Sequence, residues 1–243
     1  MCIRDRVNEA FKKSLEYKPT KSARLDQHDT NIKKDKPPKQ IRVKRIKPSY
    51  FSLHLELEPI KAAIDKLVLQ NLGKVSPEAT KMLNLLFFQS RFLEEFHVTL
   101  CHFTHRKSEI VKQQEIWNKY MKHYESCIKL FENDNKKDIG KFLKTGETIK
   151  IKLVKLIWDS KIVTLVVEFL LDKSETSNGI VEGFQCANTT PHITIGLLDD
   201  ETRPYYSNSL CEMARTNGVV EQDYYELEFK DSKEYSGEVY INL

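Results

Sequence analysis

The sequence predicts an α+β domain, and three features of its 243 residues indicate this fold class. Several segments alternate apolar and polar residues with the period of two that is typical of half-buried strands. Other segments place apolar residues three and four positions apart, as amphipathic helices do. In addition, a strand pattern at residues 95–100 returns at residues 190–196. This internal echo indicates a domain assembled from two related halves.

The first part of the domain predicts a strand, two helices and a second strand. Tyr50–Glu58 alternates apolar and polar residues, as a half-buried strand does. Pro59 suits the first position of a helix, where its missing N–H is not needed, and Ser76-Pro77 is a cap followed by a proline that opens a second helix. Phe96–Thr104, which holds aromatic and β-branched residues, predicts the next strand.

The middle part predicts a long helix and a hairpin. Ser108 is expected to cap a helix that runs to about Phe131, after which the charged segment Asn133–Gly146 is expected to be a loop. Ile149–Trp158 and Ile162–Leu171 are joined by a short polar turn and predict an antiparallel hairpin. The helix carries a mainly aromatic stripe that we expect in the core: Ile110, Trp117, Tyr120, Tyr124, Cys127 and Phe131.

The last part predicts three or four strands and one helix. A strand is expected near Val181–Cys186, before the strand that holds His192. A helix is expected to begin at Thr202-Arg203-Pro204 and to end at Asn217-Gly218, where glycine favours a helix terminus. Tyr224–Lys230 and Glu238–Leu243 predict the closing strands.

Residues 1–48 are expected to be a basic, largely disordered tail or linker. They are rich in lysine, poor in apolar residues and interrupted by Pro37-Pro38. The folded domain is expected to span residues 49–243.

Composition limits the classes of protein that the sequence can encode. The net charge is +4, but residues 1–48 hold 15 Lys/Arg against 6 Asp/Glu, so the rest of the chain is mildly acidic. Bulk charge therefore gives no argument that the domain itself binds nucleic acid. No apolar run reaches the ~18 residues of a membrane span, and we expect no secretory signal. Five cysteines without a CxxC pair favour reduced thiols and a cytoplasmic or nuclear protein.

Two short strings carry the functional signal. They are Glu95-Phe96-His97-Val98-Thr99-Leu100 and Pro191-His192-Ile193-Thr194-Ile195-Gly196. Successive side chains of a strand point to opposite faces, so the His and the Thr of each string share one face. By the same rule His102, five residues after His97, is expected to face the other way. We therefore do not count His102 and His105 among the candidate site residues. A lone histidine of this kind is most simply structural, but the matched pair favours a site built from both strings.

Two histidines and two threonines suit the opening of a cyclic phosphodiester. A base must take a proton from water while an acid protonates the leaving oxygen on the opposite side of phosphorus, and histidine can do either near neutral pH. The candidates are His97 and His192, and although the spacing leaves their order open, we prefer His97 as the base. Thr99 and Thr194 would present hydroxyls to the phosphate oxygens, where charge accumulates. This chemistry needs no metal and no cofactor.

Both strings resemble the paired HxTx signatures of the 2H phosphoesterase superfamily. They are most similar to the C-terminal cyclic phosphodiesterase domain of fungal-type tRNA ligases, over about Ser49–Leu243. The resemblance implies a bilobal fold in which two pseudo-symmetric antiparallel sheets with outer helices surround a central cleft. It also implies hydrolysis of an RNA 2′,3′-cyclic phosphate to a 2′-phosphate and 3′-hydroxyl end in tRNA splicing.

The resemblance also implies partners. The substrate would be a tRNA exon half with a 2′,3′-cyclic phosphate end, and the basic tail would connect the domain to the kinase and ligase domains of a longer protein. The sequence contains neither GxxxxGK[ST] nor GxGxxG, so this chain alone cannot be the kinase or the ligase. We expect a monomer without a membrane partner.

Other functions stay open. A 2H fold could bind RNA ends without turnover, or hydrolyse another substrate such as 2′-5′ oligoadenylate, because the motif residues address only the phosphate. A zinc site at His97 and Cys101 would need a helix, whereas the residues around them favour a strand. Base recognition would fall to aromatic residues such as Phe51, Tyr205 and Tyr206.

Overall fold

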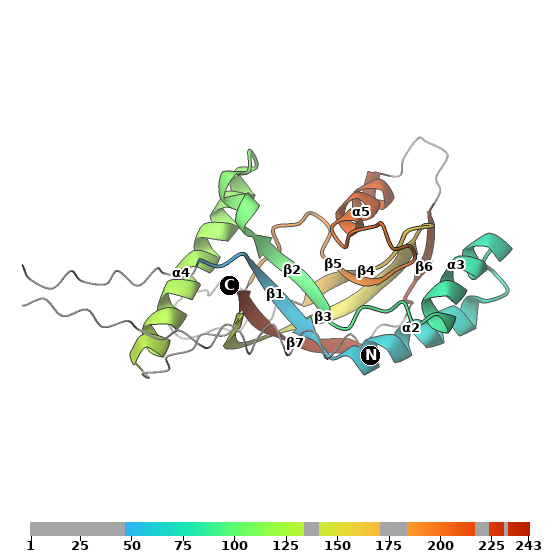
Figure 1. Ribbon diagram of the computed structural model, residues 1–243, viewed down its shortest axis with the longest axis horizontal. Helices are drawn as coiled ribbons and strands as arrows, with labels where there is room; N and C mark the ends of the chain where they lie inside the picture. The colour runs from blue at the N-terminus through green and yellow to red at the C-terminus, as the bar shows by residue number, and fades with distance from the viewer. Residues whose placement is uncertain (1–46, 134–140, 171–183, 217–223, 231–232) are drawn as a thin grey trace, which may run out of the picture. The chain divides into compact units, whose positions relative to one another are not determined.

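The structure, a computed structural model, describes residues 47–133, 141–170, 184–216, 224–230 and 233–243. All of them belong to one compact unit, Arg45–Leu243 (Figure 1). The predicted tail lies almost entirely outside the described residues, so its boundary with the domain stays a prediction.

In the described residues, seven antiparallel strands form the sheet that carries the site. The hydrogen-bonded order is β4-β5-β2-β1-β7-β3-β6, and an additional pairing of β4 with β3 closes the first six strands into a ring. Both histidine strands, β2 and β5, are neighbours in this ring. The strands are β1 (Tyr50–Leu55), β2 (Phe96–His102), β3 (Phe142–Trp158), β4 (Ile162–Leu170), β5 (His192–Leu197), β6 (Tyr225–Glu228) and β7 (Glu234–Asn242).

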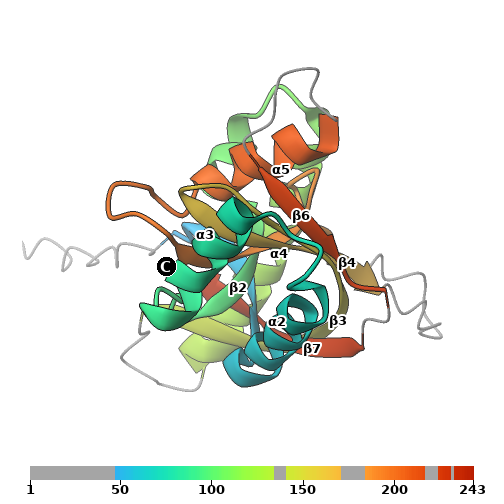
Figure 2. The same ribbon diagram turned by 90° about the vertical axis from the view of Figure 1, so that its right-hand side faces the viewer.

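Four α-helices and one short 3₁₀ helix accompany the sheet in the described part of the chain. They are α2 (Leu57–Asn71), α3 (Pro77–Phe88), η1 (Phe103–Lys107), α4 (Val111–Asn133) and α5 (Tyr206–Thr216). Ser76 caps α3 as predicted, since its side chain accepts a hydrogen bond from the backbone N–H of Ala79. Figure 2 shows α2 and α3 side by side. The predicted α+β class is confirmed. None of the helices that the structure describes is long and apolar enough to cross a membrane.

The main core lies between helices α2, α3 and α4 and one face of the sheet, while α5 packs on the other face in a second apolar cluster. Inward-facing strand residues such as Phe51, Val98, Leu153 and Ile193 are fully buried. Helix α4 adds the predicted aromatic residues to it, since Trp117, Tyr120 and Tyr124 are buried. Ile110 of the predicted stripe is instead 56% exposed, because it precedes the first helical residue, Val111. The side chain of Phe131 lies outside the described residues.

The third strand begins earlier than predicted. The segment expected to be a loop up to Gly146 contains the start of β3, which pairs with β7 from Phe142 onward. The register of the two strands shifts between Lys144 and Thr148, and Gly146 has a φ of +78°, which favours glycine. This irregularity within β3 explains why the segment has the composition of a loop although it belongs to a strand.

Other boundaries also differ from the prediction. Phe184–Cys186, the described part of the expected strand at 181–186, is not a strand; it lies against the core through a hydrogen bond from the Tyr120 hydroxyl to the carbonyl of Gln185. Helix α5 begins at Tyr206 rather than Thr202, because Thr202 closes a turn on the carboxylate of Asp199. Strand β1 ends at Leu55, and β7 begins at Glu234 rather than at Glu238.

Candidate active site

The structure brings the four predicted site residues together on two neighbouring strands. β2 and β5 pair antiparallel, with Val98 opposite Ile193. His97 and Thr99 flank Val98 on β2, and His192 and Thr194 flank Ile193 on β5, so the four residues surround this one pairing. The charge of His192 contributes to the lowered pKa of His97, which places the two imidazoles near each other.

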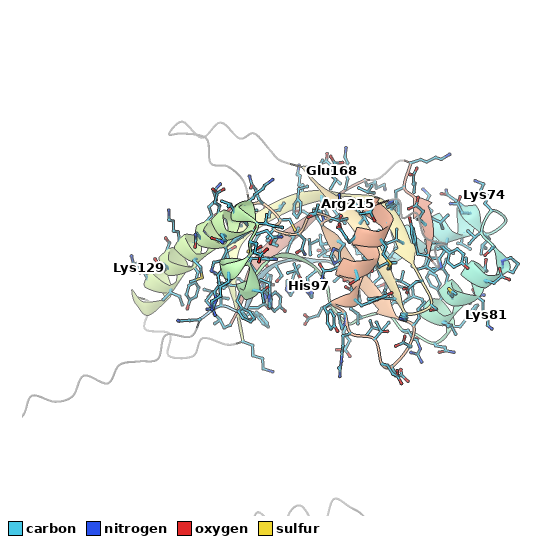
Figure 3. The ribbon with its side chains drawn as sticks, turned by 90° about the horizontal axis from the view of Figure 1, so that it is seen from above. Lys74, Lys81, His97, Lys129, Glu168 and Arg215 are labelled. Atoms are coloured by element: carbon cyan, nitrogen blue, oxygen red, sulfur yellow. The ribbon has the colours of Figure 1, made fainter. Side chains whose placement is uncertain are left out.

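Burial shows that the four side chains share the face that points away from the core. Val98 and Ile193 are fully buried between them. His97, Thr99 and Thr194 are partly exposed, and His192 is 7% exposed. Seen from above, His97 lies between helices α4 and α5 (Figure 3). The structure thus confirms the predicted alternation, in which the His and the Thr of each string share one face.

His97 lies in an environment that disfavours a positive charge. Its register partner on β1 is His54, and the two rings stack with centroids 5.5 Å apart. The ring of Tyr50 lies 6.0 Å away, and the buried Nδ1 atom has no hydrogen-bond partner in the described structure. Desolvation, followed by the charges of His54 and His192, lowers the pKa of His97 to about 4, although Glu95 opposes the shift. His97 is therefore neutral at physiological pH.

His192 has hydrogen-bond partners at both ring nitrogens. Its Nδ1–H donates to the backbone carbonyl of Thr190 at 2.8 Å, and its Nε2 lies 3.0 Å from Oγ of Ser207. Burial lowers the pKa of His192, while the bond to Thr190 raises it. The carbonyl also fixes the ring orientation and leaves Nε2 as the nitrogen that can exchange a proton.

The second threonine belongs to the same hydrogen-bond network. Oγ1 of Thr194 donates to Oγ of Ser207 at 3.1 Å and lies 3.5 Å from the carbonyl of Pro204. The hydroxyl of Ser207 in turn donates to that carbonyl at 2.7 Å. On the other strand, the carbonyl of Thr99 accepts a hydrogen bond from the thiol of Cys186.

A pocket of about 510 Å³ adjoins His192. Its walls come from the loop before β5, from α5 and from the start of α4, and most of its lining side chains are amides and hydroxyls. The volume falls within the ~300–1,000 Å³ that is typical of small-ligand sites. The lining residues include Gln113, Asn188, Thr189, Asn208, Ser209 and Glu212.

His102 lies on the same face as His97, so the prediction that it faces the other way is wrong. The pairing of β1 with β2 shifts register between Phe51 and Ser52, and both Leu100 and Cys101 are buried in succession. This bulge adds one residue to β2 and reverses the alternation after it. The ring of His102 consequently contacts Tyr50, the same ring that contacts His97.

The three aromatic candidates for base recognition differ in their exposure and contacts. Phe51 is fully buried and packs on Tyr120, so it cannot contact a ligand and this expectation is wrong. Tyr205 is 74% exposed. The hydroxyl of Tyr206 donates to Asp159 at 2.9 Å, which gives this side chain a structural partner.

The described residues contain no group of three or more His, Cys, Asp or Glu side chains that could hold a metal ion. In the zinc alternative, Cys101 lies in the core, whereas His97 lies on the opposite face of β2. The two side chains therefore do not converge.

Sequence reasoning missed Ser207 and the carbonyl of Thr190. A backbone carbonyl has no signature in a sequence. Ser207, however, begins the buried stripe of α5, which continues with Leu210, Cys211 and Ala214 at helical spacing. A serine that occupies the first position of an apolar helix stripe is a sequence signal for a buried hydroxyl.

Comparison with known proteins gives the family of the chain. The family model described as the fungal tRNA ligase phosphodiesterase domain matches residues 2–243. The chain therefore belongs to the family of fungal tRNA ligase phosphodiesterase domains. This membership makes it an enzyme of the phosphodiesterase kind, connected with tRNA splicing. A comparison with curated proteins gives no match.

Solved structures support the fold. One that matches is entitled "Crystal Structure of Fungal RNA Kinase", with a TM-score of 0.57 at 19% sequence identity. The alignment covers 99% of this chain and 53% of that one, so the chain spans about half the length of the solved protein. At this identity the likeness concerns the fold alone.

Proposed function

We propose that this chain is a metal-independent RNA 2′,3′-cyclic phosphodiesterase of tRNA splicing. Its substrate is the cyclic phosphate that ends a tRNA exon half, and its product carries a 2′-phosphate and a 3′-hydroxyl. Family membership supports the phosphodiesterase class, and the paired strands support the particular reaction.

In the proposed reaction water attacks phosphorus and the bond from phosphorus to O3′ breaks. One histidine takes a proton from the water, and the other gives a proton to O3′ as it leaves. The hydroxyls of Thr99 and Thr194 stabilise the charge on the non-bridging oxygens. The order of the roles, with His97 as the base and His192 as the acid, stays a prediction.

The antiparallel pairing of β2 with β5 is the observation that carries this proposal. Because Val98 lies opposite Ile193, the His and the Thr of both strands surround one common pairing. A phosphate placed over this pair has an imidazole and a hydroxyl on each of two sides. In-line displacement requires this distribution, since the attacking and leaving oxygens lie on opposite sides of phosphorus.

We also propose the bilobal arrangement that the 2H resemblance implies. The described strands form one continuous sheet, and β3 supports a division of it into two halves. Its first part pairs with β7, while its last part pairs with β4 and β6. One half then contains β2 with His97, and the other contains β5 with His192.

The proposed context is a monomeric domain tethered to kinase and ligase domains in the cytoplasm or nucleus. The match to about half of a longer solved chain supports such a tether.

The proposal is tested with purified protein and an RNA that ends in a 2′,3′-cyclic phosphate. We expect turnover in EDTA and a product that carries its phosphate on O2′, identified by ³¹P NMR of the product end. His97→Ala and His192→Ala should each abolish turnover, while His123→Ala, a partly exposed histidine on α4, should preserve it.

The other functions give different results. Binding of the RNA without turnover would support an RNA-binding module, and preference for a 2′-5′ linked oligoadenylate would change the substrate. Loss of activity in EDTA that zinc restores would contradict metal independence. Near-full activity in either single histidine variant would contradict the two-histidine mechanism.

A further inference from the structure

Helix α5 places a buried serine against the second string. Ser207 is 2% exposed and occupies the first turn of the helix. The rest of the buried helix face is apolar and packs on Ile157, Ile162 and Val166 of β3 and β4. A polar side chain in this position needs hydrogen-bond partners, because burial of an unpaired hydroxyl costs ~1–3 kcal/mol.

The hydroxyl of Ser207 finds these partners in the site. Its shortest contact, 2.7 Å, is the bond that it donates to the carbonyl of Pro204. With its one hydrogen used there, its lone pairs face Nε2 of His192 at 3.0 Å and the Thr194 hydroxyl at 3.1 Å. Ser207 therefore joins the histidine and the threonine of the second string through one oxygen atom.

This arrangement surrounds His192 with acceptors. Nδ1 lies against the carbonyl of Thr190 and Nε2 lies against Ser207. An imidazolium donates from both nitrogens, so the two acceptors partly offset the burial that lowers the pKa of His192. Among the described residues, the titratable groups near the ring include His97, across the strand pair, and Cys211 and Glu212, which share the pocket with His192.

The residue before Ser207 anchors it. Tyr206 donates its hydroxyl to Oδ2 of Asp159 at 2.9 Å, and Oδ1 of that carboxylate accepts the backbone N–H groups of Lys161 and Ile162. Asp159, which is 6% exposed, belongs to the turn between β3 and β4. Hydrogen bonds thus link the first turn of α5 to the sheet immediately beside Ser207.

We propose that Ser207 is a positioning residue: before substrate binds, it contacts Nε2 of His192 and accepts the hydrogen bond of the Thr194 hydroxyl, so that both side chains are held in place until the substrate takes over these two contacts. It acts through these two side chains rather than on the substrate. The inference rests on the proposed cyclic phosphodiesterase function. It adds a third hydroxyl, that of Ser207, to the half of the site that contains His192 and Thr194.

The test compares Ser207→Ala, Ser207→Thr and Tyr206→Phe with the wild-type protein. Ser126→Ala is the matched control, because Ser126 is an exposed serine within α4. Two quantities are measured for each: steady-state kinetics on a cyclic-phosphate RNA, and the pKa of each site histidine by NMR titration. The NMR measurement reports on the contact whether or not the protein turns over this RNA.

We expect Ser207→Ala to lower kcat about tenfold to a hundredfold with little change in KM, as the loss of a hydrogen bond to a charged group does. The pKa of His192 should fall, while that of His97 should change less. Ser207→Thr keeps the hydroxyl and should restore both quantities, and Tyr206→Phe should show the same pattern more weakly.

Two outcomes would overturn the inference: wild-type kcat and an unchanged His192 pKa in Ser207→Ala, or lost activity that Ser207→Thr does not restore while the His192 pKa stays constant. The second pattern would mean that the serine only stabilises the helix. Absence of turnover by the wild-type protein would contradict the proposed function instead, and the titration would still decide whether Ser207 acts on His192.

Discussion

The two histidine strings lie on neighbouring strands of the sheet but differ in their surroundings. His97 has aromatic neighbours, a buried nitrogen without a partner in the described structure, and a pKa of about 4. His192 has a hydrogen-bond partner at each nitrogen, from Thr190 and Ser207. The alternation of a strand therefore decides where each imidazole points, whereas neighbours outside the motif decide how readily it holds a proton. Matching motifs do not imply matching chemistry.

Removal of either imidazole should have the largest effect. We expect His97→Ala and His192→Ala each to lower kcat by ~10²–10⁴-fold, the usual contribution of general acid–base catalysis. Despite their different surroundings, both should be required. A loss confined to one of them would mean that the two strings are not halves of a single mechanism. Single-turnover kinetics on a cyclic-phosphate RNA measures this.

Stability at acidic pH should separate the two histidines next. The pKa of His97 is about 4 in the folded protein and about 6.5 in an unfolded chain. Between these values the unfolded chain binds more protons, so the free energy of unfolding should fall as the pH drops from about 6.5 to about 4, by at most about 3 kcal/mol from this residue.

The measurement is urea unfolding at pH 7.5 and at pH 4.5. His97→Gln should flatten the pH dependence more than His192→Gln does, because the bond to Thr190 opposes the lowered pKa of His192. Lys122→Gln, an exposed control on α4, should keep the wild-type slope. If both histidine variants flatten the pH dependence of the free energy of unfolding equally, the predicted difference between the two histidines is wrong.

The position four residues after each histidine should also distinguish the strings. After His192 this residue is Gly196, where a Cβ atom would collide with the side chain of Leu86 and the carbonyl of Arg91. Gly196→Ala should therefore destabilise the fold by about 1–3 kcal/mol. After His97 it is the buried Cys101, and Cys101→Ala should cost less because it adds no atoms. Thermal unfolding of both variants checks the order.

The threonines should give the smallest difference. Thr99→Ala and Thr194→Ala should each lower kcat about tenfold if their hydroxyls contact the phosphate. Thr194→Ala should have the larger effect, because it also removes the bond to Ser207. Thr→Ser at each position should restore most of the rate. A larger loss in Thr99→Ala would show that the bond to Ser207 adds nothing to catalysis.

The sequence predicted what local periodicity controls. Because a strand alternates with period two, the common face of His97 with Thr99 and of His192 with Thr194 could be derived without a structure. The same rule failed at His102, because a bulge in β2 depends on the pairing with β1. The burial of Ser207 could be anticipated from the stripe of α5, but its contact with His192 could not, since this contact requires α5 to dock on the sheet. Sequence periodicity therefore predicts which face of a strand a residue occupies, but not the contacts between separate strands and helices.

The last strand has a consequence for how the protein folds. β7 lies between β1 and β3, so the final residues of the chain pair with its first described strand (Figure 1). During synthesis both neighbours emerge from the ribosome before β7 does, and their facing edges have no partner until then. Such non-local pairing folds slowly, and open strand edges invite association with other chains. Truncation after Tyr235 would leave that gap permanently, and we expect the shortened chain to depend on chaperones and to aggregate.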